Sequence, residues 1–134
     1  MIKKNSKIFL AGHKGMVGSA ILRKLKEKKY SKVITIEKSK LNLLNQLKVE
    51  NFLKKIKPKI VIIAAARVGG ILANNQFKAN FIYENLMIQN NLIHGSYKAG
   101  VKKLVFLGSS CVYPKNCSQP MKEEYLLTGK LEET

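Results

Sequence analysis

The sequence has little cysteine and no long hydrophobic run. Its two cysteines, Cys111 and Cys117, are too few for a disulfide framework and lie far from any histidine pattern typical of zinc sites. No apolar stretch approaches the roughly 18 residues that span a bilayer. The first residues lead into a strand and a glycine turn rather than a cleavable signal. We therefore expect a cytoplasmic chain with no metal and no membrane partner.

Arginine and acidic residues are also scarce. Arg23 and Arg67 are the only arginines among 25 basic residues, and eight acidic residues leave a net charge of +17. Lysines that neutralise phosphates give non-specific affinity for nucleic acids. Here they are scattered over predicted helix faces and turns, without the arginine clusters and aromatic platforms that strand recognition uses. A solvated lysine surface with no specific nucleic-acid partner is the favoured interpretation, and a general preference for polyanions is the alternative.

Apolar runs alternate with amphipathic stretches along the chain. Strands are predicted at 7–11, 32–36, 60–64 and 103–107, and helices at 16–29, 44–56 and 77–98. The run at 60–64 is apolar throughout, as in a parallel sheet covered on both faces. Pro58 ends the second helix, and Gly100 stands where a left-handed cap follows the third. This order predicts an α/β fold: one Rossmann-type domain over 1–134, with a doubly wound parallel sheet and helices on both faces.

The third helix is expected to lie mostly in the core. Any surplus apolar face could form a dimer interface made of helices. Its apolar residues are Phe81, Ile82, Leu86, Ile88, Ile93 and Tyr97.

A glycine-rich turn joins the first strand to the first helix. Its glycines are spaced three apart, and this strand-before, helix-after context is typical of a dinucleotide site. Glycines permit a tight turn and let a pyrophosphate approach the helix N-terminus. The residues predicted to bind the cofactor here are Gly12, His13, Lys14, Gly15, Met16, Val17 and Gly18. A turn that serves packing alone is the alternative.

The residues after the second strand bear on which dinucleotide binds. Glu37 would hydrogen-bond a ribose 2′-hydroxyl and repel a 2′-phosphate, whereas Lys14 and Lys38 would attract the phosphate. The two lysines favour NADP, and NAD remains the alternative.

Four stretches together carry a more specific resemblance. In this order and spacing they closely resemble the GDP-L-fucose synthases, a family of extended short-chain dehydrogenase/reductases, over essentially the whole chain. They are AGHKGMVGSAI at 11–21, LNLLN at 41–45, AAARVGGILANN at 64–75 and FLGSSCVYPKNCSQPMKEEYLLTGKLEET at 106–134. The resemblance implies conversion of GDP-4-keto-6-deoxy-D-mannose to GDP-L-fucose, by inversion at C3 and C5 and reduction of the C4 ketone with NADPH. Related enzymes pair through helices, so the resemblance also implies a homodimer for the full-length protein.

The resemblance also implies roles for individual residues. Ser109 matches the serine that hydrogen-bonds the sugar ketone, and Cys111 matches a thiol that acts as a base in epimerisation. A hydroxyl at the carboxyl end of a strand can stabilise the oxyanion that forms when a ketone accepts hydride, and a thiol can remove a proton next to a ketone. Without the resemblance, capping hydroxyls and a small buried thiol are the alternative interpretations. The implied cofactor contacts beyond the glycine turn are Lys38, Leu41, Asn42, Leu43, Leu107, Gly108, Ser109 and Ser110.

The family's Tyr-x-x-x-Lys pair is absent, because Tyr113 is followed four residues later by Cys117 and Tyr125 by Gly129. We therefore expect the chain to be the amino-terminal part of a longer enzyme and to be inactive alone. Another sugar-nucleotide epimerase or dehydratase of the same superfamily, and a non-catalytic nucleotide-binding module, are the alternative functions.

Overall fold

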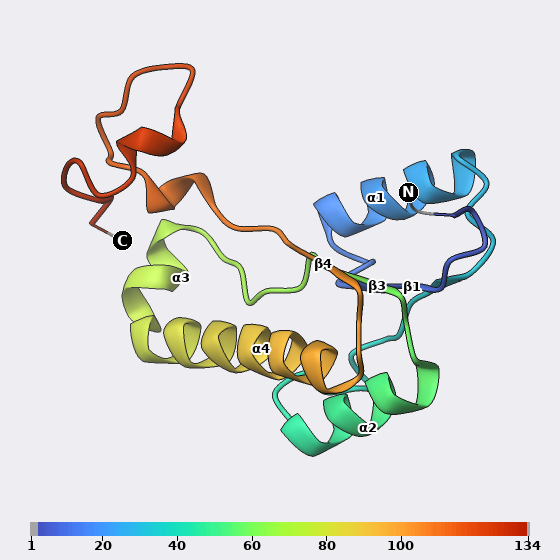
Figure 1. Ribbon diagram of the computed structural model, residues 1–134. Helices are drawn as coiled ribbons and strands as arrows, with labels where there is room; N and C mark the ends of the chain where they lie inside the picture. The colour runs from blue at the N-terminus through green and yellow to red at the C-terminus, as the bar shows by residue number, and fades with distance from the viewer. Residues whose placement is uncertain (1–2, 134) are drawn as a thin grey trace.

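The computed structural model, which describes residues 3–133, has a parallel sheet at its centre (Figure 1). Its strands follow the order β2-β1-β3-β4, so β1 and β3 are central and β2 and β4 form the edges. All three strand pairs are parallel. The strands are β1 (Ile8–Ala11), β2 (Val33–Ile34), β3 (Ile60–Ile63) and β4 (Lys103–Phe106).

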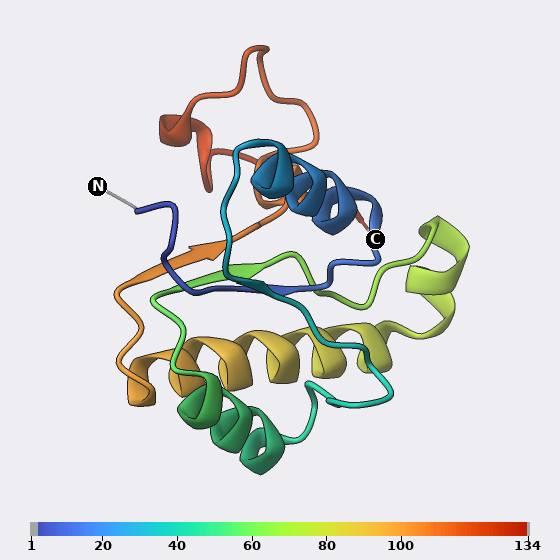
Figure 2. The ribbon, with the colours of Figure 1, turned by 90° about the vertical axis from the view of Figure 1, so that its right-hand side faces the viewer.

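Helices lie on both faces of this sheet. One face carries α1, and the other carries α2 and α4, which pack against each other (Figures 1 and 2). The predicted fold class is therefore confirmed. The helices are α1 (Met16–Glu27), α2 (Gln46–Ile56), α3 (Ile71–Gln76) and α4 (Lys78–Lys98), with short 3₁₀ turns η1 (Ser110–Val112) and η2 (Glu123–Tyr125).

Local chemistry accounts for the ends of these helices. The Asn45 side chain accepts a hydrogen bond of 2.9 Å from the Lys48 N–H and so caps the start of α2. Lys57 adopts a left-handed conformation with φ 45° directly before Pro58, where the sequence predicts that the helix ends. Gly100 has φ +72° after α4, which confirms its predicted role as a left-handed residue.

The core lies between the central strands and the α2–α4 face. Phe9, Leu53, Val61 and Leu92 are fully buried there, and the rings of Phe9 and Phe52 meet edge to face. The helix α1 lies on the opposite face, and its one buried residue is Gly18. Beyond it the edge strand β4 leaves Phe106 exposed, and the segment after β4 leaves the sheet on the α1 side (Figure 2).

The third predicted helix is present as α4, but the sequence did not predict the helix α3 before it and placed the apolar residues of α4 mostly in the core. The separate short helix α3 precedes α4, because Phe77 leaves helical geometry with ψ 38° between them. The apolar residues of α4 are also not mostly in the core. Phe81 is buried, but four others are exposed: Ile82, Leu86, Ile93 and Tyr97. Among residues 3–133, no helix combines the length and hydropathy needed to cross a membrane.

Candidate functional site

A cavity of about 940 Å³ lies at the carboxyl ends of β1, β2 and β3. Residues 12–17, 36–38, 41–44 and 64–68 line it, together with Glu84 and Ile88 of α4. Because β2 and β3 lie on opposite sides of β1, the segments that follow them form opposite walls, with the glycine turn after β1 between. This is where open α/β sheets bind their ligands.

The glycine turn packs too closely for side chains at two of its positions. Gly12 has φ +84°, and a Cβ there would lie 2.4 Å from the carbonyl oxygen of Ala64. A Cβ on Gly18 would lie 2.0 Å from the carbonyl oxygen of Gly12. Gly15 differs, because the nearest atom to its Cβ would be 3.5 Å away. Gly12 and Gly18 thus hold strand, turn and helix together, while Gly15 leaves space at the surface of the cavity.

The N-terminus of α1, which is the positive end of the helix dipole, is not capped by a side chain. Its cap residue Gly15 has no side chain, and its first turn contains no acidic residue. Met16 and Val17, which begin the helix, line the cavity and are exposed. The unpaired N–H groups and dipole of such a helix end attract anions, phosphate above all.

Lys14 and Glu37 form an ion pair on the cavity surface. Lys14 Nζ lies 2.7 Å from Glu37 Oε1. The Lys14 side chain is 69% exposed and the Glu37 side chain is 49% exposed. The hydrogen bond and charge of Lys14 hold the pKa of the Glu37 carboxyl below its ordinary value of 4.5, with smaller help from Lys40 and His13. Glu37 is therefore ionised at neutral pH and competes for Lys14 with any incoming anion.

The wall that follows β2 is tied to α4. The buried Asn91 side chain donates a 2.8 Å hydrogen bond to the Leu43 carbonyl oxygen. Asn42 stabilises the same turn, since its Oδ1 accepts from the Leu44 N–H at 3.0 Å. Leu41 is buried with 4% exposure. These contacts give the 41–44 segment a fixed path beside the cavity.

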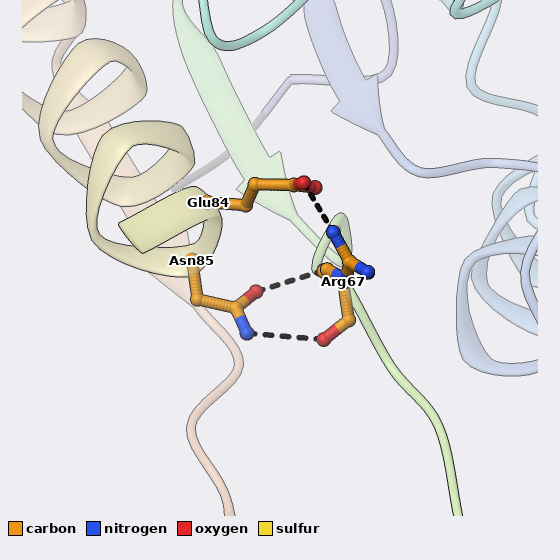
Figure 3. Close-up of polar contacts among 3 residues, drawn as sticks. All are labelled: Arg67, Glu84 and Asn85. Atoms are coloured by element: carbon orange, nitrogen blue, oxygen red, sulfur yellow. Dashed lines mark hydrogen bonds and ion pairs between the residues drawn. The ribbon is translucent and has the colours of Figure 1, made fainter. Parts of the chain in front are cut away.

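The wall that follows β3 is tied to α4 in a different way (Figure 3). The Arg67 N–H donates to Asn85 Oδ1 at 2.8 Å, and Asn85 Nδ2 donates to the Arg67 carbonyl oxygen at 3.0 Å. The Arg67 guanidinium pairs with the Glu84 carboxylate and lies 4.9 Å from the centre of the Phe81 ring. Backbone and side chain of Arg67 are both held by a single face of α4.

The structure brings together part of the predicted site. Residues 12–17, Lys38 and 41–43 line one cavity, whereas Gly18 is buried behind the turn. Leu107, Gly108, Ser109, Ser110 and Cys111 do not line this cavity and are exposed. Ser109 Oγ accepts a 3.1 Å hydrogen bond from the Cys111 N–H, so the two residues share one turn.

Sequence reasoning missed the second wall of the cavity. Ala64 to Val68 belong to a stretch that carries the family resemblance, yet the prediction gives them no role. Their position directly after a buried central strand was a usable signal, because that is where ligands meet an α/β sheet. Nothing local in the sequence marks Glu84 or Ile88, which reach the cavity only through the packing of α4.

Comparisons with known proteins agree with this geometry. The model of the NAD dependent epimerase/dehydratase family matches residues 8–134. A GDP-L-fucose synthase from Sinorhizobium fredii is 57% identical over 128 residues, which cover 96% of this chain and 40% of that protein. The chain thus spans about two fifths of this relative's length.

Two solved structures share the fold. MlghC, a GDP-mannoheptose C4 reductase from Campylobacter jejuni with NADP bound, has a TM-score of 0.92 and 46% identity over 98% of this chain and 42% of that one. A GDP-L-fucose synthetase from Naegleria fowleri bound to NADP has a TM-score of 0.84 and 27% identity over 100% of this chain and 40% of that one.

Proposed function

The chain belongs to the NAD dependent epimerase/dehydratase family, and we propose that it is the NADP-binding part of an enzyme that converts GDP-4-keto-6-deoxy-D-mannose to GDP-L-fucose. The observation that carries the cofactor proposal is the uncapped, acid-free N-terminus of α1 behind a glycine turn, at a cavity large enough for a dinucleotide. The substrate follows from the similarity to GDP-L-fucose synthases.

Residues of this chain fit such a cofactor. The N–H groups of Met16 and Val17 would hold the pyrophosphate, and Gly15 leaves room for it to approach. Lys14 and Lys38 would bind the 2′-phosphate, while the wall at 41–43 receives the adenosine half. When bound, NADPH supplies the hydride that reduces the C4 ketone.

Ser109 and Cys111 would act on the sugar. The Ser109 oxygen accepts from the Cys111 N–H, which leaves its own hydroxyl hydrogen free to donate to the ketone oxygen. The Cys111 thiolate would take a carbon-bound proton next to that ketone during epimerisation. Both residues are exposed after β4, so a bound sugar nucleotide would cover them.

A second substrate is favoured by one comparison. The Campylobacter jejuni relative at 46% identity is a reductase of a GDP-mannoheptose. A different GDP-sugar is therefore the alternative within the same chemistry.

We further propose that the full-length protein is a cytoplasmic homodimer. Four exposed apolar residues of α4 are spaced by four, seven and four positions, which places them along one side of the helix: Ile82, Leu86, Ile93 and Tyr97. Pairing this side with its copy would remove it from water. Analytical ultracentrifugation tests this interface. The full-length protein should sediment as a dimer, and Leu86→Lys should convert it to a monomer.

The test of activity is an NADPH-oxidation assay with GDP-4-keto-6-deoxy-D-mannose and with a GDP-4-keto-heptose. A protein extended through a Tyr-x-x-x-Lys pair should oxidise NADPH with the first sugar, and Ser109→Ala should lower kcat by about 10² or more. The 134-residue chain alone should give no turnover, because no tyrosine in it is followed four residues later by lysine. An unaffected Ser109→Ala enzyme would show that the serine is misassigned.

A further inference from the structure

Helix α4 holds both walls of the cavity through two asparagines. Asn91 donates to the carbonyl oxygen of Leu43 in the wall after β2, and Asn85 pairs with both backbone groups of Arg67 in the wall after β3. Each wall is therefore held to α4 by its own asparagine.

The walls face different halves of a dinucleotide. The sheet order β2-β1-β3-β4 places the glycine turn between them, and the pyrophosphate of a bound dinucleotide sits at that turn. The adenosine half lies toward the residues that follow β2. The nicotinamide half then lies toward the side of β3 and β4, where Ala64 to Val68 line the cavity.

The segment after β3 depends on α4 for its conformation. Residues 64–70 form no helix or strand, and Val68 is 84% exposed. Asn85 supplies what a neighbouring strand would otherwise supply, one acceptor for the Arg67 N–H and one donor for its carbonyl oxygen (Figure 3). Glu84 and Phe81, on the same side of the helix, restrain the guanidinium.

We propose that Asn85 is a positioning residue for the nicotinamide half of the cofactor, acting through the backbone of Arg67. Asn85 itself is not among the residues that line the cavity. Its role is to keep the 64–68 wall in one conformation, so that binding does not have to order a free loop. This inference rests on the proposed binding of NADP.

The experiment compares two ligands by calorimetry on this chain. NADPH reaches both walls, whereas adenosine 2′,5′-bisphosphate reaches only the turn and the wall after β2. Asn85→Leu removes both hydrogen bonds at nearly constant size, and it should weaken NADPH by about tenfold, as expected for the loss of one to two hydrogen bonds. Binding of the bisphosphate should not change.

Two further variants keep the result interpretable. Asn85→Asp still accepts from the Arg67 N–H but cannot donate to the Arg67 carbonyl oxygen, so it should weaken NADPH binding and leave bisphosphate binding unchanged. This variant provides the test if Asn85→Leu does not fold. Glu50→Gln removes an α4–α2 ion pair outside the cavity. It should lower thermal stability and leave binding of both ligands unchanged.

Distinct results separate the two proposals. If the unmodified chain binds both ligands and the Asn85 variants weaken both equally, or weaken neither, the positioning role is wrong while the cofactor site stands. If Glu50→Gln weakens NADPH as much as the Asn85 variants do, the effect is one of general stability and the inference fails. An unmodified chain that binds neither ligand overturns the cofactor proposal and this inference with it.

Discussion

Lys14 and Glu37 make cofactor choice a competition between two anions for one ammonium group. The carboxylate already occupies Lys14 at 2.7 Å, so a 2′-phosphate gains Lys14 only by displacing it. A ribose 2′-hydroxyl pays no such cost and can bind Glu37 directly. The pair therefore reduces a preference for NADP that the lysines alone would give.

Glu37→Gln should raise the ratio of NADPH to NADH affinity. The gain should be about two- to fivefold, because both charges are exposed and screened by solvent. Calorimetric titration of both cofactors at low salt gives this ratio. A ratio that stays constant would mean that Glu37 does not compete.

Lys14→Glu should act in the opposite direction. It places a second carboxylate near the 2′-phosphate and should weaken NADPH more than NADH. Equal weakening of the two cofactors would place Lys14 away from the 2′-phosphate, and Lys24→Glu on the outer part of α1 is the matched control for the change in net charge.

Glu50 couples stability to pH. The residue is only 7% exposed. Hydrogen bonds from Lys98 and, to a smaller extent, from Gln46 hold the pKa of its carboxyl below the ordinary value of 4.5. A carboxyl whose pKa is depressed by folding stabilises the folded state above its unfolded pKa, and this contribution is lost as pH falls through the folded pKa. The pair should therefore stabilise the protein at pH 7 and contribute little at strongly acidic pH.

The prediction for Glu50→Gln is a loss of stability that depends on pH. Urea denaturation should show the variant to be less stable than the unmodified chain at pH 7, with a difference that shrinks progressively below about pH 4.5. A difference that is constant with pH would assign the effect to packing and not to the charge.

At the level of elements, the contact between β1 and α1 is set by its glycines. Replacing a helical glycine with alanine normally stabilises a helix by about 1 kcal/mol. At Gly18 the new Cβ would meet the Gly12 carbonyl oxygen at 2.0 Å, and because that atom is backbone the helix itself must move. Overpacking of this kind outweighs the gain in propensity.

Gly18→Ala should therefore destabilise the protein by about 2 kcal/mol or more. Gly15→Ala meets no atom closer than 3.5 Å, so its melting temperature should be unchanged while NADPH binding weakens, since the new methyl group occupies the surface that the pyrophosphate approaches. Thermal melts and calorimetry of the two variants separate the roles. A stable Gly18→Ala would contradict the close contact described above.

The order of the elements follows from features that the sequence displays locally. The apolar run at 60–64 and the glycine turn at 12–18 each specify their own structure, because burial on both faces and a tight turn leave few alternatives. Pro58 and Gly100 fix helix ends for the same reason. All four predicted strands and all three predicted helices are present.

What the sequence did not reveal depends on tertiary contacts. Ile82 and Tyr97 are apolar like Phe81, and only the packing of α4 determines which of them faces the sheet. The pairing of Asn85 with Arg67 joins residues 18 positions apart in sequence and has no periodic signature. Local pattern therefore located the glycine turn but not the cavity wall that follows β3.

At the scale of the whole molecule, the net charge of +17 predicts a response to polyanions. The lysines should give weak, sequence-independent binding to duplex DNA that falls steeply between about 50 and about 200 mM salt. Fluorescence anisotropy with two unrelated duplexes measures both properties. Tight binding of one duplex in high salt would instead indicate a dedicated nucleic-acid surface.

The edge strand β4 also has a consequence for how this chain behaves in concentrated solution. Within residues 3–133 no strand pairs with its outer row of backbone groups, and Phe106 is exposed beside it. Such an edge is a template on which another copy can add a strand. At low ionic strength, repulsion between highly cationic molecules opposes this encounter, and added salt screens it. Storage conditions that protect many proteins from ionic association would, for this chain, promote the growth of sheet-like aggregates from β4.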